Sequence, residues 1–161
     1  MNEPQAGRVV SVNVNEGGVP KLPVPEQWVG FRGLADDRHI EPEPMHGGPE
    51  RAVCIYSMEA IARVVADGHN AFPGAFGENL TLEGIEMSSL DPGDRLAIGS
   101  EGLVIEITSH AAPCHKQEQW FSDGRFVRIS HKLHPEDSRW YARVVSEGTV
   151  RPEDEVSRVL T

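Results

Sequence analysis

The sequence predicts a mostly β fold with two or three helices, closed or nearly closed into a barrel. Short segments of β character dominate the chain, and 16 glycines and 12 prolines separate them along its whole length. Only two segments show the spacing of apolar residues that is typical of helices. A barrel suits many short strands, because closure leaves no sheet edge exposed. The 161 residues fit one domain, residues 1–161, with a core that is stable without disulfides.

The expected strands lie between turn signals. Residues 8–14 alternate apolar and polar side chains, as a half-buried strand does. Residues 91–94 (DPGD) are a strong turn signal, and the two short β segments that follow them are typical of a hairpin. The expected strands are residues 8–14, 51–56, 95–98, 103–108, 140–145 and 154–160.

Two helices are expected between these strands. Ser57 is a favoured N-cap residue, apolar residues at helical spacing follow it, and Gly68 ends the segment. The first helix should therefore cover residues 57–67. Apolar residues at positions i, i+3 and i+7 predict a second helix near residues 124–133.

Charge and hydropathy argue against two classes of partner. A formal net charge of −10 does not suit a nucleic-acid-binding protein, because phosphate contacts require clustered lysines and arginines. No apolar segment approaches the ~20 residues that span a membrane. Residues 1–7 are polar and lack the apolar region of a signal peptide, so we expect a cytoplasmic protein.

Cys114 is the first candidate for chemistry. It follows the expected strand at residues 103–108, and His115 and Lys116 place positive charge beside its thiol. Such charge lowers the pKa of a thiol and increases the thiolate fraction. A thiolate is a nucleophile, a ligand for soft metals, or a carrier of sulfane sulfur as a persulfide. The alternative is an inert, buried cysteine.

The other cysteine, Cys54, lies between two apolar residues of an expected strand, so we interpret it as a core residue. Two cysteines are too few for a disulfide framework. The histidines show no zinc-site spacing relative to the cysteines, and the chain has no phosphate loop or dinucleotide fingerprint. A protease-type Cys–His dyad would need a histidine partner for Cys114, and nothing in the sequence positions one.

Two glycine-containing loops are candidates for binding an anion. Gly47 and Gly48 can expose backbone N–H groups in an anion nest, to which His46 and Arg51 would add charge. A plain glycine turn is the alternative. The second loop, residues 74–81, carries a carboxylate and an amide that either fix a polar ligand or cap turns.

Four short segments occur in an order that is typical of a known family. They are residues 46–53 (HGGPERAV), 75–80 (AFGENL), 92–95 (PGDR) and 113–114 (PC). This set resembles the MOSC domain, named after the C-terminal domain of molybdenum cofactor sulfurases, and in particular its stand-alone bacterial members. The resemblance continues through residues 140–144 (WYARV) and 147–148 (EG), and covers roughly residues 7–156.

The resemblance implies a barrel-like β domain that binds a molybdenum-pterin cofactor. The stand-alone bacterial members are molybdenum-cofactor-dependent reductases of N-hydroxylated bases. Their signature cysteine matches Cys114, and it is proposed either to ligate molybdenum or to carry sulfur as a persulfide. Glycine loops and basic residues would hold the anionic cofactor. The implied cofactor-binding residues are Arg38, His46, Gly47, Gly48, Arg51, Gly77, Glu78, Asn79 and Lys116.

The chain departs from the family at two places. Relatives usually carry Pro-Arg-x-Pro-Cys, whereas residues 110–114 read HAAPC, so Ala111 stands where an arginine is usual. One guanidinium, with its bidentate contact to phosphate, is therefore missing from this position. The usual Gly-Asp pair upstream of the His-Gly-Gly motif is replaced within residues 33–38, where Arg38 still supplies positive charge.

Together these observations predict an oxidoreductase that reduces an N-hydroxylated or related small substrate, with the Cys114 thiolate on molybdenum and an electron-donor protein as partner. Two alternatives stay open. The first is a sulfur carrier, in which Cys114 receives sulfane sulfur from a pyridoxal-phosphate-dependent cysteine desulfurase. The second is a non-enzymatic cofactor-binding module, which the alanine at position 111 favours.

Overall fold

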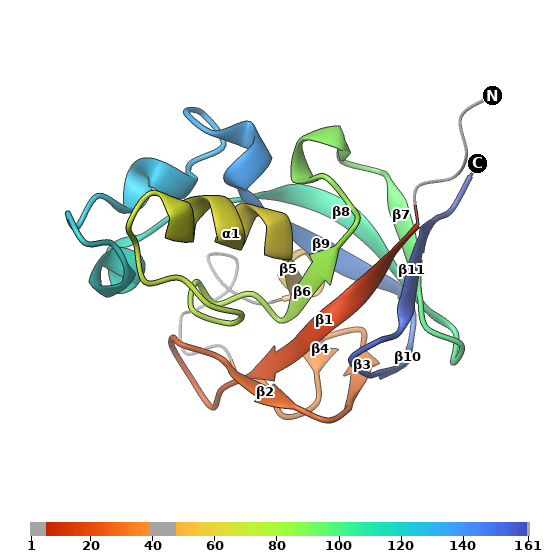
Figure 1. The fold of residues 1–161 in the computed structure, drawn as a ribbon. Coiled ribbons are helices and arrows are strands. Elements are labelled where there is room, and N and C mark those ends of the chain that lie inside the picture. Colours follow the sequence, from red (N-terminus) through yellow and green to blue (C-terminus); the bar gives the residue numbers. More distant parts are fainter. Residues whose placement is uncertain (1–5, 39–47, 161) are drawn as a thin grey trace.

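Seven strands form a closed barrel (Figure 1). They are β1 (Ala6–Val14), β5 (Val53–Ser57), β6 (Leu80–Glu83), β7 (Arg95–Ile98), β8 (Leu103–Ala111), β9 (Arg139–Ser146) and β11 (Glu155–Arg158). The computed structural model describes residues 6–38 and 48–160. Around the barrel the order is β11-β7-β8-β9-β5-β6-β1, and β11 pairs with β1 to close the sheet. The predicted mostly β, barrel-like fold is therefore confirmed.

Neighbouring barrel strands are antiparallel except for β5 and β6, which run parallel. A parallel pair needs a crossover connection, and helix α1 (Met58–Ala66) lies within it. Short strands complete the β structure. They are β2 (Leu22–Val24), which pairs with β1, and a small sheet of β10 (Gly148–Val150), β3 (Gln27–Gly30) and β4 (Gly33–Leu34).

Helix α1 begins and ends at the residues that the sequence indicates. The Oγ of Ser57 accepts a hydrogen bond from the N–H of Ala60 at 3.1 Å, which is the N-cap arrangement. Gly68 follows the helix with a φ of 94°, in the left-handed region that glycine favours. The remaining helical segments are short 3-10 helices. These are η1 (Pro49–Arg51), η2 (Met87–Ser89), η3 (His115–Trp120), η4 (Phe126–Ile129) and η5 (Pro135–Asp137).

The second expected helix, residues 124–133, is shorter than predicted, because only η4 is helical there. Arg128 of η4 forms ion pairs with Asp67 at 2.9 Å and with the buried Asp137 at 2.7 Å. Ile129 is fully buried. These tertiary contacts fix the segment without a regular helix, and Leu133 at its end is exposed.

Two large apolar clusters stabilise the molecule. One fills the barrel. The other packs between α1 and the 3-10 helices, where the ring of Phe76 stacks on Phe121 at 5.3 Å. In Figure 1, α1 and the segments around η3 and η4 cover one end of the barrel, away from β7 and β11. A third, small cluster of Cys54, Ala111 and Tyr141 joins β5, β8 and β9.

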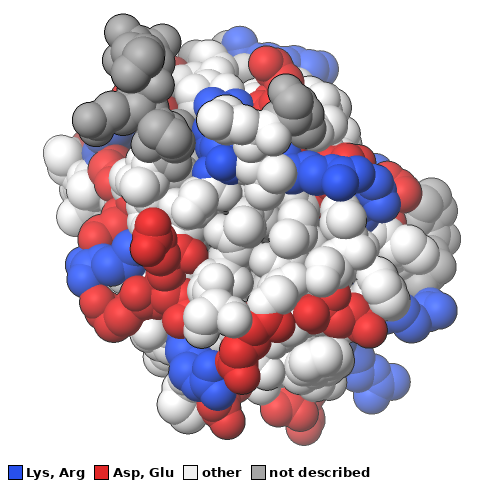
Figure 2. Space-filling model, turned by 90° about the vertical axis from the view of Figure 1, so that its right-hand side faces the viewer, with Lys and Arg blue, Asp and Glu red and all other residues white. Residues whose placement is uncertain are grey.

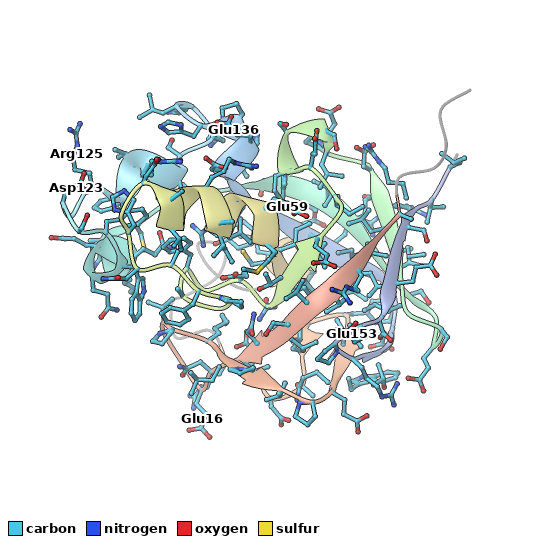
Figure 3. All side chains as sticks on the ribbon, viewed as in Figure 1. Glu16, Glu59, Asp123, Arg125, Glu136 and Glu153 are labelled. Carbon is cyan, nitrogen blue, oxygen red and sulfur yellow. The ribbon has the colours of Figure 1, made fainter. Side chains whose placement is uncertain are left out.

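Many charged side chains lie on the outside of the molecule and pair with one another. Figure 2 shows acidic and basic side chains side by side on one face. Arg8, for example, pairs with Glu83 at 2.5 Å. No helix in the described part of the chain combines the length and the apolar character needed to cross a membrane. Figure 3 shows Glu16, Asp123 and Arg125 at the outer edge of the molecule.

Removal of the N-cap tests the account of α1. S57A should lower the free energy of unfolding by about 1 kcal/mol, because a helix N–H loses its partner. Urea denaturation followed by circular dichroism measures this change. S100A alters an exposed turn residue, and this control should change the value by less than about 0.5 kcal/mol. Equal effects of the two substitutions would contradict the N-cap assignment.

Candidate functional site

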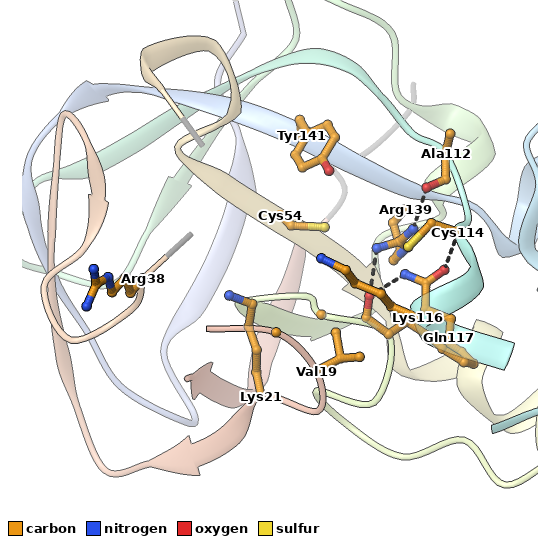
Figure 4. A pocket seen from close by; sticks show the side chains of 13 residues that line it. Val19, Lys21, Arg38, Cys54, Ala112, Cys114, Lys116, Gln117, Arg139 and Tyr141 are labelled. Carbon is orange, nitrogen blue, oxygen red and sulfur yellow. Dashed lines mark hydrogen bonds between the residues drawn. The ribbon is translucent and has the colours of Figure 1, made fainter. Parts of the chain in front are cut away.

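A pocket of about 80 Å³ lies where β5 and β9 meet the segment that follows β8 (Figure 4). It brings together segments that are far apart in the sequence, including both cysteines. The residues that line it are Gly18, Val19, Lys21, Arg38, Cys54, Phe76, Gly77, Ala112, Cys114, Lys116, Gln117, Arg139 and Tyr141.

Gln117 fixes Cys114 against the neighbouring loop. The N–H of Cys114 donates to Oε1 of Gln117 at 2.9 Å, and Nε2 of Gln117 donates to the carbonyl of Phe76 at 2.8 Å. Gln117 is 3% exposed, so water hardly competes for these bonds. Gly77, next to Phe76, has a φ of 91°, and a Cβ there would lie 3.1 Å from Val19. A glycine is therefore required where this loop approaches the pocket.

Arg139 forms the inner wall. Its guanidinium donates to the carbonyl oxygens of Phe76 at 2.7 Å and Ala112 at 3.0 Å. Only 4% of the residue is exposed. In Figure 4 the guanidinium lies between the sulfur atoms of Cys54 and Cys114. Arg139 thus places buried positive charge beside the thiol of Cys54, in the pocket that Cys114 also lines.

A buried ion pair supports another wall of the pocket. Nζ of Lys21 lies 2.6 Å from both carboxylate oxygens of Asp37, and the two side chains are 7% and 2% exposed. Nδ2 of Asn79 donates to Asp37 at 2.9 Å, while Oδ1 of Asn79 accepts the N–H of Cys54 at 3.0 Å. Asn79 therefore connects the ion pair to strand β5.

The environment of Cys54 makes its thiol a weaker acid than an ordinary cysteine thiol. Burial raises the pKa of its thiol to about 11, although Arg139 and Lys21 oppose the increase. Cys54 is therefore a thiol at neutral pH. Tyr141 lies directly opposite Cys54 on β9, and burial also raises the pKa of its phenol. Tyr141 keeps its proton and can donate it in a hydrogen bond within the pocket.

Cationic side chains predominate over anionic ones in the lining of the pocket, although Asp37 pairs with one of them, Lys21. None of the described residues that line it is an aspartate or a glutamate, whereas the chain carries a formal net charge of −10. A pocket of this kind attracts a small anion. The cationic residues in its lining are Lys21, Arg38, Lys116 and Arg139.

Four residues predicted for the site line this one pocket: Arg38, Gly77, Cys114 and Lys116. The pocket thus joins the predicted cysteine segment to the predicted glycine loop at residues 74–81. His46 and Gly47 lie outside the described residues.

The other predicted residues have supporting positions. Glu78 is fully buried, burial raises its pKa, and its Oε2 accepts the hydroxyl of Thr81 at 3.0 Å. Asn79 lies behind the wall, as described above. Gly48 is the N-cap of η1, and Arg51 at the end of η1 lies 5.2 Å from the centre of the Tyr141 ring. That distance allows a cation–π contact.

Sequence reasoning missed Lys21, Gln117 and Arg139, and it treated Cys54 only as a core residue. One signal was available for Arg139. It directly precedes the expected strand at residues 140–145, and extension of that strand by one residue would place Arg139 on the same face as Tyr141, because residues i and i+2 of a strand point to the same face. Lys21 lies in a proline-rich segment without periodicity, so no local pattern indicated its buried ion pair.

A model of one protein family, the MOSC domain, matches residues 42–157. The chain belongs to the MOSC domain family. This MOSC domain is 31% identical over 134 residues to Protein YiiM of Escherichia coli (strain K12), a match that covers 79% of the domain and 58% of YiiM. It is 29% identical over 115 residues to the Uncharacterized protein YflK of Bacillus subtilis (strain 168), covering 66% of the domain and 47% of YflK. The chain therefore spans about half the length of these relatives.

Solved structures share the fold of this MOSC domain. YiiM from Geobacillus stearothermophilus superposes with a TM-score of 0.71 at 24% identity, over 96% of this chain and 75% of that one. The YUAD protein from Bacillus subtilis gives a TM-score of 0.74 at 17% identity, over 100% of both chains. These likenesses support the barrel topology, and the chemistry of the site has to be argued from its own residues.

The two thiols should differ in reactivity. Iodoacetamide at neutral pH should label Cys114 much faster than Cys54, because Cys114 is half-buried whereas Cys54 is 6% exposed and protonated. As the pH rises toward the Cys54 pKa of about 11, its thiolate fraction and its labelling rate should increase. Peptide mass spectrometry measures both rates. In urea-denatured protein the two should label alike, and faster labelling of Cys54 in folded protein would contradict the assignment.

Proposed function

We propose that this MOSC domain binds a molybdenum-pterin cofactor and reduces N-hydroxylated or related small substrates, with the thiolate of Cys114 as the molybdenum ligand. The observation that carries the proposal is a half-buried thiol in a pocket lined by cations and, among the described residues, by no carboxylate. Thiolates select soft metals. Cations pair with the anionic groups of a pterin cofactor. Membership of a family associated with this cofactor agrees with both.

The residues of the pocket fit such a group. Cys114 provides a soft sulfur donor, and Gly77, which has no side chain, exposes its backbone in the lining of the same pocket. Lys116 and Arg139 would hold negatively charged groups of the cofactor. When bound, the cofactor supplies the redox chemistry that removes an oxygen atom from the substrate.

The chain itself prepares the ligand and keeps competing groups inactive. Gln117 holds the backbone of Cys114 in place. Burial keeps Cys54 protonated at neutral pH, so it does not compete as a ligand. Burial raises the pKa of the Tyr141 phenol, so this side chain stays protonated in the wall of the pocket. A reducing, cytoplasmic compartment, which this proposal includes, would keep both thiols free of disulfides.

A second function is a sulfur carrier, and one observation favours it. Cys54 lines the same pocket as Cys114, so a persulfide on Cys114 would face a pocket that holds a second thiol. The sulfur would come from a pyridoxal-phosphate-dependent cysteine desulfurase, which would be the partner. In the reductase the partner is instead an electron-donor protein.

Metal content separates the two functions. Protein made in a host that produces the cofactor should contain about one molybdenum atom and one pterin per protein molecule, since one thiolate ligand binds one metal. C114S should lose most of the metal and the reductase activity, because a hydroxyl is a poor soft ligand. C54S, the same change in the same pocket, should retain the metal.

Inductively coupled plasma mass spectrometry and pterin fluorescence provide the measurements. A C114S protein with full molybdenum content and turnover would refute the reductase. Metal-free wild-type protein with a persulfide on Cys114 would support the sulfur carrier instead.

A further inference from the structure

Arg139 is a buried cation that donates hydrogen bonds to three backbone carbonyl oxygens and also interacts with the thiol of Cys54. Nη1 donates to Phe76 at 2.7 Å, and Nη2 donates to Ala112 at 3.0 Å and to Ala111 at 3.4 Å. Nε is buried without a hydrogen-bond partner in residues 6–38 and 48–160. A guanidinium has five N–H donors. Part of this capacity therefore remains for a ligand in the pocket that Arg139 lines.

The register of β8 and β9 explains how Arg139 reaches this position. Arg139 is the cross-strand partner of Ala111. Ala111 is fully buried, and it occupies the position where the resemblance to the MOSC family places an arginine. The guanidinium of Arg139 thus approaches the backbone before Cys114 from the neighbouring strand.

The surroundings of Arg139 leave room for an anionic partner. A buried cation is costly without an anionic partner, and carbonyl dipoles compensate for it only in part. Glu78 interacts with Arg139, and burial raises the pKa of this carboxyl group although the charge of Arg139 opposes the increase. In the described part of the chain, no carboxylate forms an ion pair with Arg139.

We propose that Arg139 is the anion-binding residue of the pocket and that it binds a phosphate-type oxyanion beside Cys114. It supplies from β9 the guanidinium that position 111 lacks. Arginine suits this task because its planar donors match the oxygen atoms of phosphate. Only the source of the oxyanion rests on the proposed function: if the domain binds the pterin cofactor, the oxyanion is the phosphate of that cofactor. A free phosphate-containing ligand is the other source.

Inorganic phosphate and cofactor-free protein provide a test that needs no molybdenum. Phosphate bound beside Cys114 should slow the alkylation of this thiol in the wild type. R139A should weaken the apparent affinity for phosphate about tenfold or more, because charged hydrogen bonds are lost. R143A is the matched control, since Arg143 lies on the same strand but pairs with Glu106 and does not line the pocket. It should bind phosphate like the wild type.

The double variant A111R/R139A gives a sharper result. It returns a guanidinium to β8 and should restore the protection by phosphate that R139A loses. If thermal unfolding shows that R139A is not folded, R139K is used in its place. The lysine keeps the charge but not the planar donors, so R139K should bind phosphate more weakly than the wild type. Absence of protection in the wild type, full protection in folded R139A or R139K, or no recovery in a folded A111R/R139A protein would overturn the inference.

The source of the oxyanion is decided by equilibrium dialysis of radiolabelled phosphate with cofactor-loaded protein. Loss of phosphate binding on loading supports the phosphate of the cofactor as the occupant. Binding that persists supports a separate phosphate-containing ligand at Arg139. If phosphate protects Cys114 from alkylation in a wild-type protein that never acquires molybdenum, the proposed reductase function is refuted, whereas the proposed role of Arg139 is supported.

Discussion

The hydrogen bonds of Arg139 hold three separate parts of the chain around one pocket. Strand β9 carries the residue, the end of β8 supplies the carbonyls of Ala111 and Ala112, and the loop before β6 supplies that of Phe76. The Phe76 carbonyl also accepts from Gln117, whose side chain holds the N–H of Cys114. A carbonyl oxygen has two lone pairs, so it can serve both donors. The position of the reactive thiol therefore depends on a shared acceptor and on one buried cation.

The same construction gives the two cysteines different roles. Cys54 lies inside β5, where burial raises the pKa of its thiol to about 11. Cys114 lies after β8 at the N-cap of η3, half-buried and on the wall of the pocket. Placement on a strand or on a loop thus decides which sulfur is available at neutral pH. Asn79 accepts the N–H of Cys54 and donates to the carboxylate of Asp37. It therefore fixes the position of β5 relative to the Lys21–Asp37 ion pair.

Much of the fold could be predicted because its signals are local. Alternation along β1, the turn before β7 and the N-cap of α1 each lie within a few residues. Residues 124–133 gave a helical pattern, but the ion pairs of Arg128 hold them in a shorter 3-10 turn. Cys114 and Gly77 were found through short motifs. Arg139 was not, because its role arises from pairing with a strand 28 positions earlier, and no local pattern records which residues become cross-strand partners.

The central claim is that Cys114 binds molybdenum in a pocket that Arg139 and Gln117 organise. X-ray absorption spectroscopy at the molybdenum edge tests it most directly, because the spectrum counts the sulfur atoms bound to the metal. Cofactor-loaded wild-type protein and C54S should show the same number of sulfur ligands, and any molybdenum retained by C114S should show one fewer. An unchanged sulfur count in C114S would contradict the account.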